Sequence, residues 1–275
     1  MICRRALSVC AAFSLGAVAA QADTSNLLPH EFYLEEPGSV TVQASFTERF
    51  PLPNVALRTD TMKIVTPSGE DQAFAEQVTT GVLTVLEAEL EETGTYRLTS
   101  GNRLGRTGHA YRHNDKIVRL NRGFDELDLP VGAELFTSQT VTLADVWVTV
   151  DEPTPYKPEP LSRLELVASE HPSCLKADMP IRFTALFDGE PLVGQPIMLT
   201  RAFGTYAGDG DGLTYTTNSQ GELAFDGLHA GVFLLMTRLI TDAPETAETD
   251  LQSYTTSLVF DVLGENSSRP GCDGL

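Results

Sequence analysis

The histidines are the residues of this sequence with the clearest potential for site chemistry. They are His30, His109, His113, His171 and His229. Neutral imidazoles are good ligands for divalent transition metals such as nickel and cobalt, with carboxylates or a thiolate completing the shell. His109 and His113 are four residues apart, so their side chains would share one face of a strand. His171 precedes Cys174 by three residues, which is a second ligand-like spacing. An ordinary role in a turn or on the surface is the alternative for each histidine.

Motifs that mark common catalytic sites are missing from the sequence. It contains no His-Glu-x-x-His pair, no Cys-x-x-Cys pair, no glycine-rich phosphate loop and no Gly-x-Ser-x-Gly elbow. A thiol nucleophile at Cys174 is the weakest hypothesis, because this cysteine has a competing use in a disulfide. We therefore expect a protein that is not an enzyme.

The N-terminal segment predicts export from the cytoplasm. Residues 1–22 combine Arg4 and Arg5, an uncharged apolar stretch and a small-x-small pattern at 20–22, as secretory signal peptides do. The apolar stretch is shorter than the roughly 20 residues that a membrane span needs. No later segment is long and apolar enough to span, so the mature chain from Asp23 is expected to lack a transmembrane segment. We expect a periplasmic or secreted protein.

Cysteine content and charge limit the chemistry further. Only Cys174 and Cys272 remain after cleavage, and an oxidising compartment favours a disulfide between them. The whole chain has 19 Lys and Arg against 38 Asp and Glu, a net charge of −19. Without Arg4 and Arg5 the balance is 17 against 38, or −21. Such an acidic protein is expected to have no nucleic-acid partner, since few cations remain to neutralise phosphates.

Alternation of apolar and polar residues dominates the mature chain. Residues 39–46 and 86–91 alternate with period two, which is typical of half-buried strands. In residues 141–150 the apolar parity switches at Ala144-Asp145, which suggests a β-bulge. Many short strands between Gly, Pro, Asn and Asp turns predict an all-β protein, with two immunoglobulin-like β-sandwich domains in tandem after the signal peptide.

A proline-rich segment predicts the domain boundary. Four prolines fall within residues 151–161, which favours an extended connector and excludes a central strand. The predicted organisation is a signal peptide at 1–22, an N-terminal sandwich at 23–150, the linker at 151–161, a C-terminal sandwich at 162–264 and a polar tail at 265–275.

Four separated stretches of the sequence carry motifs that occur together in one bacterial family. They are His30–Pro37, Leu164–Pro172, Phe183–Ile197 and Thr216–Phe225. These stretches resemble the family called domain of unknown function 4198. The resemblance implies a periplasmic all-β protein of a kind often linked to nickel or cobalt uptake. It also places His30 and His171 where the likeness is strongest.

The expected function follows from these features together. We expect a non-enzymatic accessory or binding protein that handles a divalent transition metal, nickel or cobalt, with an envelope transport or receptor protein as partner. His30 and His171 are the leading ligands, and His109 or His113 would complete the shell. The alternative is an interaction module of the cell envelope that contacts carbohydrate or protein through its sandwich loops.

Overall fold

The chain folds almost entirely into β-strands. The computed structural model describes residues 23–272, except 115, 121–122, 157, 178 and 209–211. The predicted signal peptide lies outside the described residues. Within these residues, three short helical segments interrupt the strands: η1 (Glu126–Asp128), η2 (Pro172–Cys174) and α1 (Gly204–Ala207). No helix in the described part of the chain has the length and apolarity needed to cross a membrane.

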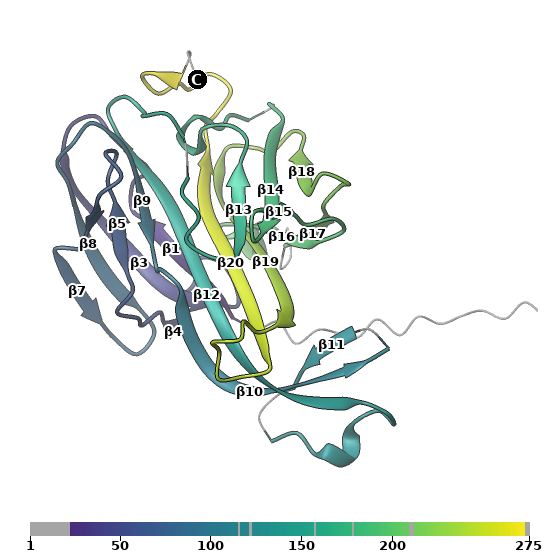
Figure 1. Cartoon of the computed structure of the whole chain (residues 1–275). Helices are drawn as coiled ribbons and strands as arrows, with labels where there is room; N and C mark the ends of the chain where they lie inside the picture. Colours follow the sequence, from purple (N-terminus) through teal and green to yellow (C-terminus); the bar gives the residue numbers. More distant parts are fainter. Residues whose placement is uncertain are drawn as a thin grey trace, which may run out of the picture.

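Three sheets form the body of the molecule (Figure 1). The first has the order β1-β3-β8-β7, with β4 beside β3. Its strands are β1 (Thr24–Pro29), β3 (Gly38–Thr47), β4 (Val55–Ala56), β7 (Glu76–Thr79) and β8 (Thr84–Leu90). The third sheet has the order β13-β14-β15, with β18 beside β14. Its strands are β13 (Leu164–Ala168), β14 (Ile181–Phe187), β15 (Glu190–Pro191) and β18 (Glu222–Phe225).

The second sheet is the largest and lies at the centre. Its order is β17-β16-β19-β20-β12-β9-β5-β6, and β2 and the β10–β11 hairpin attach to β12. Its strands are β2 (Tyr33–Leu34), β5 (Lys63–Val65), β6 (Asp71–Gln72), β9 (Gly94–Thr99), β10 (Arg103–His113), β11 (Lys116–Arg119), β12 (Glu134–Val150), β16 (Pro196–Arg201), β17 (Leu213–Thr216), β19 (Gly231–Asp242) and β20 (Leu251–Val262). The β10–β11 hairpin extends away from the body (Figure 1).

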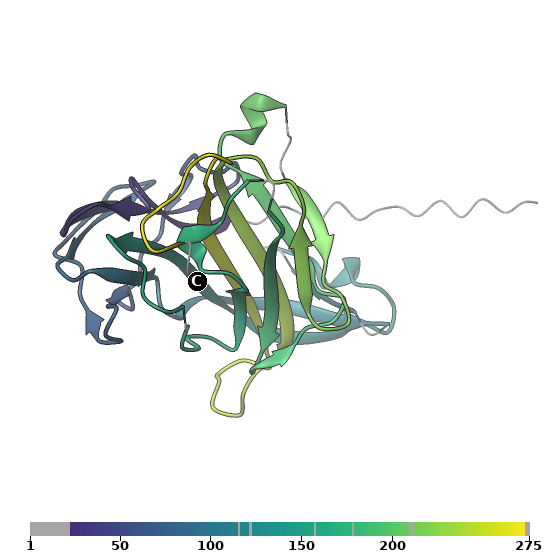
Figure 2. The same cartoon turned by 90° about the horizontal axis from the view of Figure 1, so that it is seen from above.

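The two outer sheets cover opposite faces of the central sheet. Successive side chains of a strand point to opposite faces. On β20, Val259 packs into the core beneath the first sheet, whereas Leu258 and Phe260 pack into the core beneath the third sheet. The same division separates Leu234 from Phe233 on β19. Figure 2 shows the outer sheets on the two sides of these central strands. The predicted all-β, immunoglobulin-like sandwich class is confirmed.

The two halves of the chain share one hydrogen-bonded sheet. β12, from the first half, pairs in parallel with β20, from the second half, between Ser138↔Leu251 and Val146↔Val259. The proline-rich segment 151–161 therefore carries the chain from β12 of the central sheet to β13 of the third sheet, and the two halves stay joined by hydrogen bonds. The sandwiches overlap at β12, β19 and β20, and we call this overlap the junction.

The predicted β-bulge at Ala144-Asp145 is wrong. The register of β12 against β20 runs without a shift through Ala144↔Ser257 and Asp145↔Leu258. The apolar parity switches because both faces of β12 are buried, one in each core. Val146 and Val148 face the first core, and Trp147 packs against the second. A change of apolar parity can therefore mark a strand whose two faces are buried in two different cores.

Candidate functional site

The predicted metal ligands lie on different elements. His30 follows β1, His109 and His113 belong to β10, and His171 precedes η2. Within the residues that the structure describes, no group of three or more His, Cys, Asp or Glu side chains is placed to hold a metal ion.

His30 lies at the edge of an open groove. The groove has a volume of about 530 Å³ and also contains Phe32 and Arg269. The backbone N–H of Thr41 donates to Nδ1 of His30 at 3.0 Å, so the neutral ring carries its proton on Nε2. Nε2 lies 4.0 Å from a carboxylate oxygen of Glu31. A metal at Nδ1 would have to displace the Thr41 contact, whereas the distance from Nε2 to Glu31 is too long for a hydrogen bond.

His109 and His113 share one face of β10 but cannot coordinate the same metal ion. Four residues along a strand span about 13 Å, whereas each imidazole nitrogen must come within about 2.1 Å of a metal. His109 packs instead against the ring of Phe124, with ring centroids 5.3 Å apart. His113 pairs with Lys116 at the end of the hairpin, and this cation repels a metal ion.

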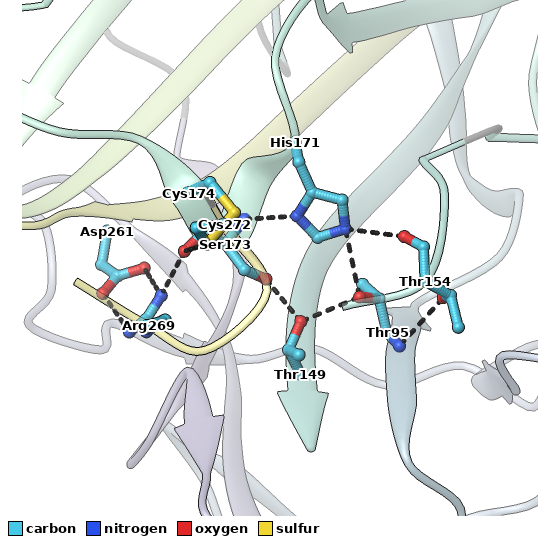
Figure 3. Close-up of a disulfide and its surroundings, with 9 residues drawn as sticks. All are labelled: Thr95, Thr149, Thr154, His171, Ser173, Cys174, Asp261, Arg269 and Cys272. Atoms are coloured by element: carbon cyan, nitrogen blue, oxygen red, sulfur yellow. Dashed lines mark hydrogen bonds and ion pairs between the residues drawn. A yellow bond between two sulfur atoms is a disulfide. The ribbon is translucent and has the colours of Figure 1, made fainter. Parts of the chain in front are cut away.

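His171 is buried and its ring is fully hydrogen-bonded (Figure 3). The Ser173 N–H donates to Nδ1 at 3.1 Å, so the neutral ring carries its proton on Nε2. Nε2 lies 3.1 Å from both the Thr154 carbonyl oxygen and the Thr95 hydroxyl. Burial lowers the pKa of His171, which keeps the ring neutral. The side chain thus caps η2 and connects it to β9 and to the proline-rich segment.

A chain of buried hydroxyl groups continues from His171. The Thr95 hydroxyl lies 2.9 Å from the Thr149 hydroxyl, which lies 2.6 Å from that of Ser173. This chain joins β9, β12 and η2 across the overlap of the two sandwiches (Figure 3). Because these groups are buried, the histidine and hydroxyls stabilise the junction.

The predicted disulfide is confirmed. Cys174 and Cys272 are bonded, with an S–S distance of 2.04 Å. The bond attaches the C-terminal tail to η2 beside His171 (Figure 3). Arg269 in the tail adds two contacts, an ion pair with Asp261 at 2.7 Å and a hydrogen bond to the Ser173 carbonyl oxygen at 2.9 Å.

Next to this cluster lies a pocket that the sequence analysis did not predict. This junction pocket has a volume of about 300 Å³ and lies between β5, β9, β12 and the proline-rich segment. It is lined by Lys63, Val65, Thr66, Pro67, Gly69, Asp71, Thr95, Arg97, Trp147, Thr154, Pro155, Tyr156, Pro158, Glu159 and Leu161. Thr95 and Thr154 are also the partners of His171, so the histidine holds two residues of the pocket wall in place.

Two aromatic side chains supply the apolar wall of the junction pocket. Trp147 of β12 and Tyr156 of the proline-rich segment meet edge to face, with ring centroids 5.1 Å apart. Tyr156 also meets the ring of His171, at 5.9 Å. Its hydroxyl accepts a hydrogen bond from the Ala168 N–H at 3.3 Å, and burial raises its pKa to about 12. The prolines on both sides of Tyr156 restrict the backbone that presents the ring.

Buried charges form the floor of the junction pocket. Arg97 of β9 pairs with Asp145 of β12 at 2.5 Å, lies 3.9 Å from Glu165 and donates to the Glu159 carbonyl oxygen. Burial alone would lower the pKa of Arg97, but the two carboxylates outweigh it and raise the pKa. Burial raises the pKa of Glu165. The second carboxylate oxygen of Asp145, Oδ1, has no hydrogen-bond partner among the described residues, and a cavity of about 10 Å³ adjoins Asp145.

Charge at the rim of the junction pocket is also paired. Lys63 and Asp71, from neighbouring strands, form an ion pair at 2.8 Å. The pocket therefore presents aromatic rings, threonine hydroxyls and ion pairs whose charges largely cancel. The sequence contained one signal of this site, since Trp147 is the only tryptophan. Its partners come from strands and loops far away in the chain, and no local spacing connects them.

Comparison with known proteins identifies one family and several structures of low similarity. The family model described as "Domain of unknown function (DUF4198)" matches residues 20–241. No curated protein matches the chain. Among solved structures, Escherichia coli alpha-2-macroglobulin activated by porcine elastase aligns at 10% identity with a TM-score of 0.23, over 89% of this chain and 20% of that chain. The chain thus spans about a fifth of the alpha-2-macroglobulin chain.

Two further structures align over most of their own length. Murine CEACAM1b is 11% identical over 87% of this chain and 99% of its own, with a TM-score of 0.21. The D0-D1 domain of Intimin is 9% identical over 86% of this chain and 97% of its own, also with a TM-score of 0.21. At these scores the alignments carry no argument about the site.

Proposed function

This chain belongs to the DUF4198 family, and we propose that it is a non-enzymatic binding protein of the cell envelope that holds a neutral carbohydrate in the junction pocket. The observation that carries the proposal is the composition of this pocket. Trp147 and Tyr156 provide aromatic surface, and the charged lining residues Lys63 and Arg97 already have carboxylate partners. Small-ligand sites commonly combine such apolar walls with a few fixed polar groups between packed layers.

The chemistry of the lining selects the ligand class. Aromatic rings favour the C–H faces of a sugar ring, because these faces are apolar and weakly positive. The hydroxyls of Thr66 and Thr154 and the Lys63–Asp71 pair offer donors and acceptors for sugar hydroxyl groups. An anionic ligand would have to compete with the carboxylate partners of Lys63 and Arg97, whereas a neutral polyol would not.

The disulfide and the predicted signal peptide support the envelope location. A disulfide persists in an oxidising compartment such as the periplasm. Nickel or cobalt handling, with an envelope transport or receptor partner, stays a prediction from the family resemblance. Among the described residues, no cluster of three His, Cys, Asp or Glu side chains supports this metal-handling role.

The proposal can be tested with the protein's own fluorescence, because Trp147 is the only tryptophan and lines the pocket. We expect cellobiose, maltose or di-N-acetylchitobiose to shift the emission of the mature, disulfide-bonded protein saturably. Calorimetry should give the same dissociation constant. We expect Asp71→Asn at the rim to weaken binding, and Lys116→Gln on the distant hairpin to leave it unchanged.

Three outcomes would overturn the proposal. The first is the absence of saturable binding to all three sugars at millimolar concentration. The second is binding that is equal in Asp71→Asn and in the unaltered protein. The third is a saturable fluorescence response to nickel chloride with none to sugars, which would favour metal handling instead.

A further inference from the structure

Positive charge gathers in one segment of this acidic protein. Residues 23–275 contain 17 Lys and Arg against 38 Asp and Glu, and residues 103–122 hold six of these cations but only one of the acids. This segment includes the β10–β11 hairpin, which extends away from the body (Figure 1). Exposed charges act over about 8 Å at physiological salt, so the hairpin attracts anions locally although the whole chain is acidic.

One face of the hairpin lies against the end of β19. Arg112 of β10 reaches across to Asp242 of β19, with a guanidinium nitrogen 2.7 Å from a carboxylate oxygen. The same guanidinium lies over the ring of Phe136, 5.0 Å from its centroid. These two contacts place the hairpin face that carries Arg112 opposite β19.

The strand register brings a second arginine of each partner strand into this contact. On β11, Arg119 pairs with Ala110, which lies two residues before Arg112, so Arg119 and Arg112 are diagonal neighbours on one face. On β19, Arg238 lies four residues before Asp242 and therefore shares its face. The hairpin thus presents Arg119 toward the central sheet, and the central sheet presents Arg238 toward the hairpin.

Both of these guanidiniums are half-buried, and neither has a carboxylate partner among the described residues. Nε of Arg238 donates to the Thr255 hydroxyl at 2.9 Å, which fixes the direction of the side chain. Burial lowers the pKa of Arg238, and the positive charge of Arg119 lowers it further. Burial also lowers the pKa of Arg119. Both side chains stay cationic at neutral pH, because a guanidinium does not lose its proton in this range.

Two cations in this arrangement require a counter-anion. Arginine is rarely withdrawn from water without a partner, and like charges repel each other more strongly as water is removed from around them. At the junction, the buried guanidinium of Arg97 has the carboxylate of Asp145. Between Arg119 and Arg238 the described chain supplies no carboxylate, so an anion from outside the chain would relieve the repulsion.

A phosphate group meets the requirements of this arrangement. Each guanidinium offers a planar set of N–H donors that matches the oxygens of phosphate. A phosphate monoester carries a charge of about −1.5 to −2 at pH 7, so it balances two cations, whereas a carboxylate balances one.

We propose that Arg119 and Arg238 bind a phosphate group where the hairpin meets β19, and we call these two residues the hairpin site. The phosphate is carried either by a free solute or by a lipid head group. The hairpin site has no residue in common with the junction pocket, so it is independent of the carbohydrate proposal.

Two binding measurements on the mature, disulfide-bonded protein test the proposal and distinguish the sources of the phosphate. The first is calorimetric titration with inorganic phosphate and with glycerol 3-phosphate, in chloride buffer of constant ionic strength. The second is sedimentation with phosphatidylcholine vesicles that do or do not contain phosphatidic acid. Saturable binding of the soluble anions assigns the site to a free solute. Binding to phosphatidic acid vesicles alone assigns it to a lipid head group.

Three kinds of variant connect binding to the named residues. We expect Arg119→Gln and Arg238→Gln each to weaken phosphate binding roughly 10- to 100-fold, because each removes charged hydrogen bonds. Asp242→Asn should strengthen it, because the carboxylate on the same face of β19 is lost. The matched control is Arg106→Gln, which removes the same charge from an exposed position of β10 outside the site and should have no effect.

Melting temperature separates a binding role from a purely structural one. In phosphate-free buffer, Arg119→Gln should melt at or above the temperature of the unaltered protein, because it removes the repulsion with Arg238. Phosphate should raise the melting temperature of the unaltered protein but not that of the variant. A structural role for Arg119 predicts instead a lower melting temperature in the absence of phosphate.

Four results would overturn the proposal. The first is the absence of saturable binding to both soluble anions and to phosphatidic acid vesicles. The second is equal weakening in Arg106→Gln and Arg119→Gln, which would indicate diffuse attraction to the whole hairpin. The third is acetate binding as tightly as inorganic phosphate, and the fourth is a lower melting temperature of Arg119→Gln in phosphate-free buffer.

Discussion

Removal of the Cys174–Cys272 disulfide is the most quantitative test of how this fold is stabilised. The bond closes a loop with a sequence separation of 98 residues, and this loop contains every strand from β14 to β20. The chain-entropy relation gives a loss of about 4.7 kcal/mol of unfolding free energy at 25 °C for a loop of this size. We therefore expect Cys174→Ser/Cys272→Ser to destabilise the whole molecule and not only the tail.

The same magnitude can be expressed as a change in melting temperature. For a protein of about 250 residues, 1 kcal/mol corresponds to roughly 2–4 °C. The double variant should therefore melt about 9–19 °C below the oxidised protein in differential scanning calorimetry. The double variant retains the Arg269 contacts to Asp261 and Ser173, so any loss belongs to the cross-link.

The unaltered protein in reducing buffer is the matched control, and it should melt at the temperature of the double variant. A double variant that melts within about 2 °C of the oxidised protein would refute the reasoning. That result would mean that the tail contacts and the shared sheet, and not restriction of the unfolded chain, determine stability.

Three further predictions concern the junction and the histidines. Burial lowers the pKa of His171 in the folded state from its ordinary value of 6.5. The unfolded chain therefore binds more protons below about pH 6.5, and the free energy of unfolding decreases as the pH is lowered. His171→Gln should remove this part of the pH dependence of the urea midpoint between pH 7.5 and 5.5, and an unchanged slope would contradict the assignment. Arg97→Met should lower the free energy of unfolding in urea by about 3–5 kcal/mol, because Asp145 stays buried without its partner. The double variant Arg97→Met/Asp145→Leu should recover most of this loss. Equal losses in the two variants would contradict the importance of the ion pair. In nickel and cobalt titration, His171→Ala should bind as the unaltered protein does, because both ring nitrogens are hydrogen-bonded; weaker binding would restore His171 as a ligand.

Much of the secondary structure follows from local pattern. The alternating stretch at 39–46 lies within β3, and the one at 86–91 covers the C-terminal part of β8 and ends one residue beyond it. These strands bury one face, so alternation specifies them directly. Alternation does not specify β10, because its sequence, RLGRTGHAYRH, contains few apolar residues and two glycines. It forms a strand because β12 and β11 hydrogen-bond to its two edges.

The sites were less predictable than the strands. The positions of His30 and His171 in matched motifs suggested a shared metal shell. Neighbouring groups occupy both ring nitrogens of His171, however, and the Thr41 N–H occupies Nδ1 of His30. Ligation requires free lone pairs in the right geometry, and residue type alone does not specify this. The junction pocket, in contrast, was not predicted but is present. Its tryptophan is visible in the sequence, whereas its other walls are contributed by distant segments.

By itself, the sequence determined the strand-rich class, the family and the disulfide pair. These properties depend on alternation between neighbouring residues, on motif order and on a count of two cysteines. Only the tertiary structure decided that both halves share one sheet, that Asp145 lies against Arg97, and that the junction pocket forms. The physical reason is that the parallel pairing of β12 with β20 joins segments more than a hundred residues apart. The two outer sheets cover both faces of these paired strands, and the packing of two cores, which no local pattern encodes, then determines which side chains meet.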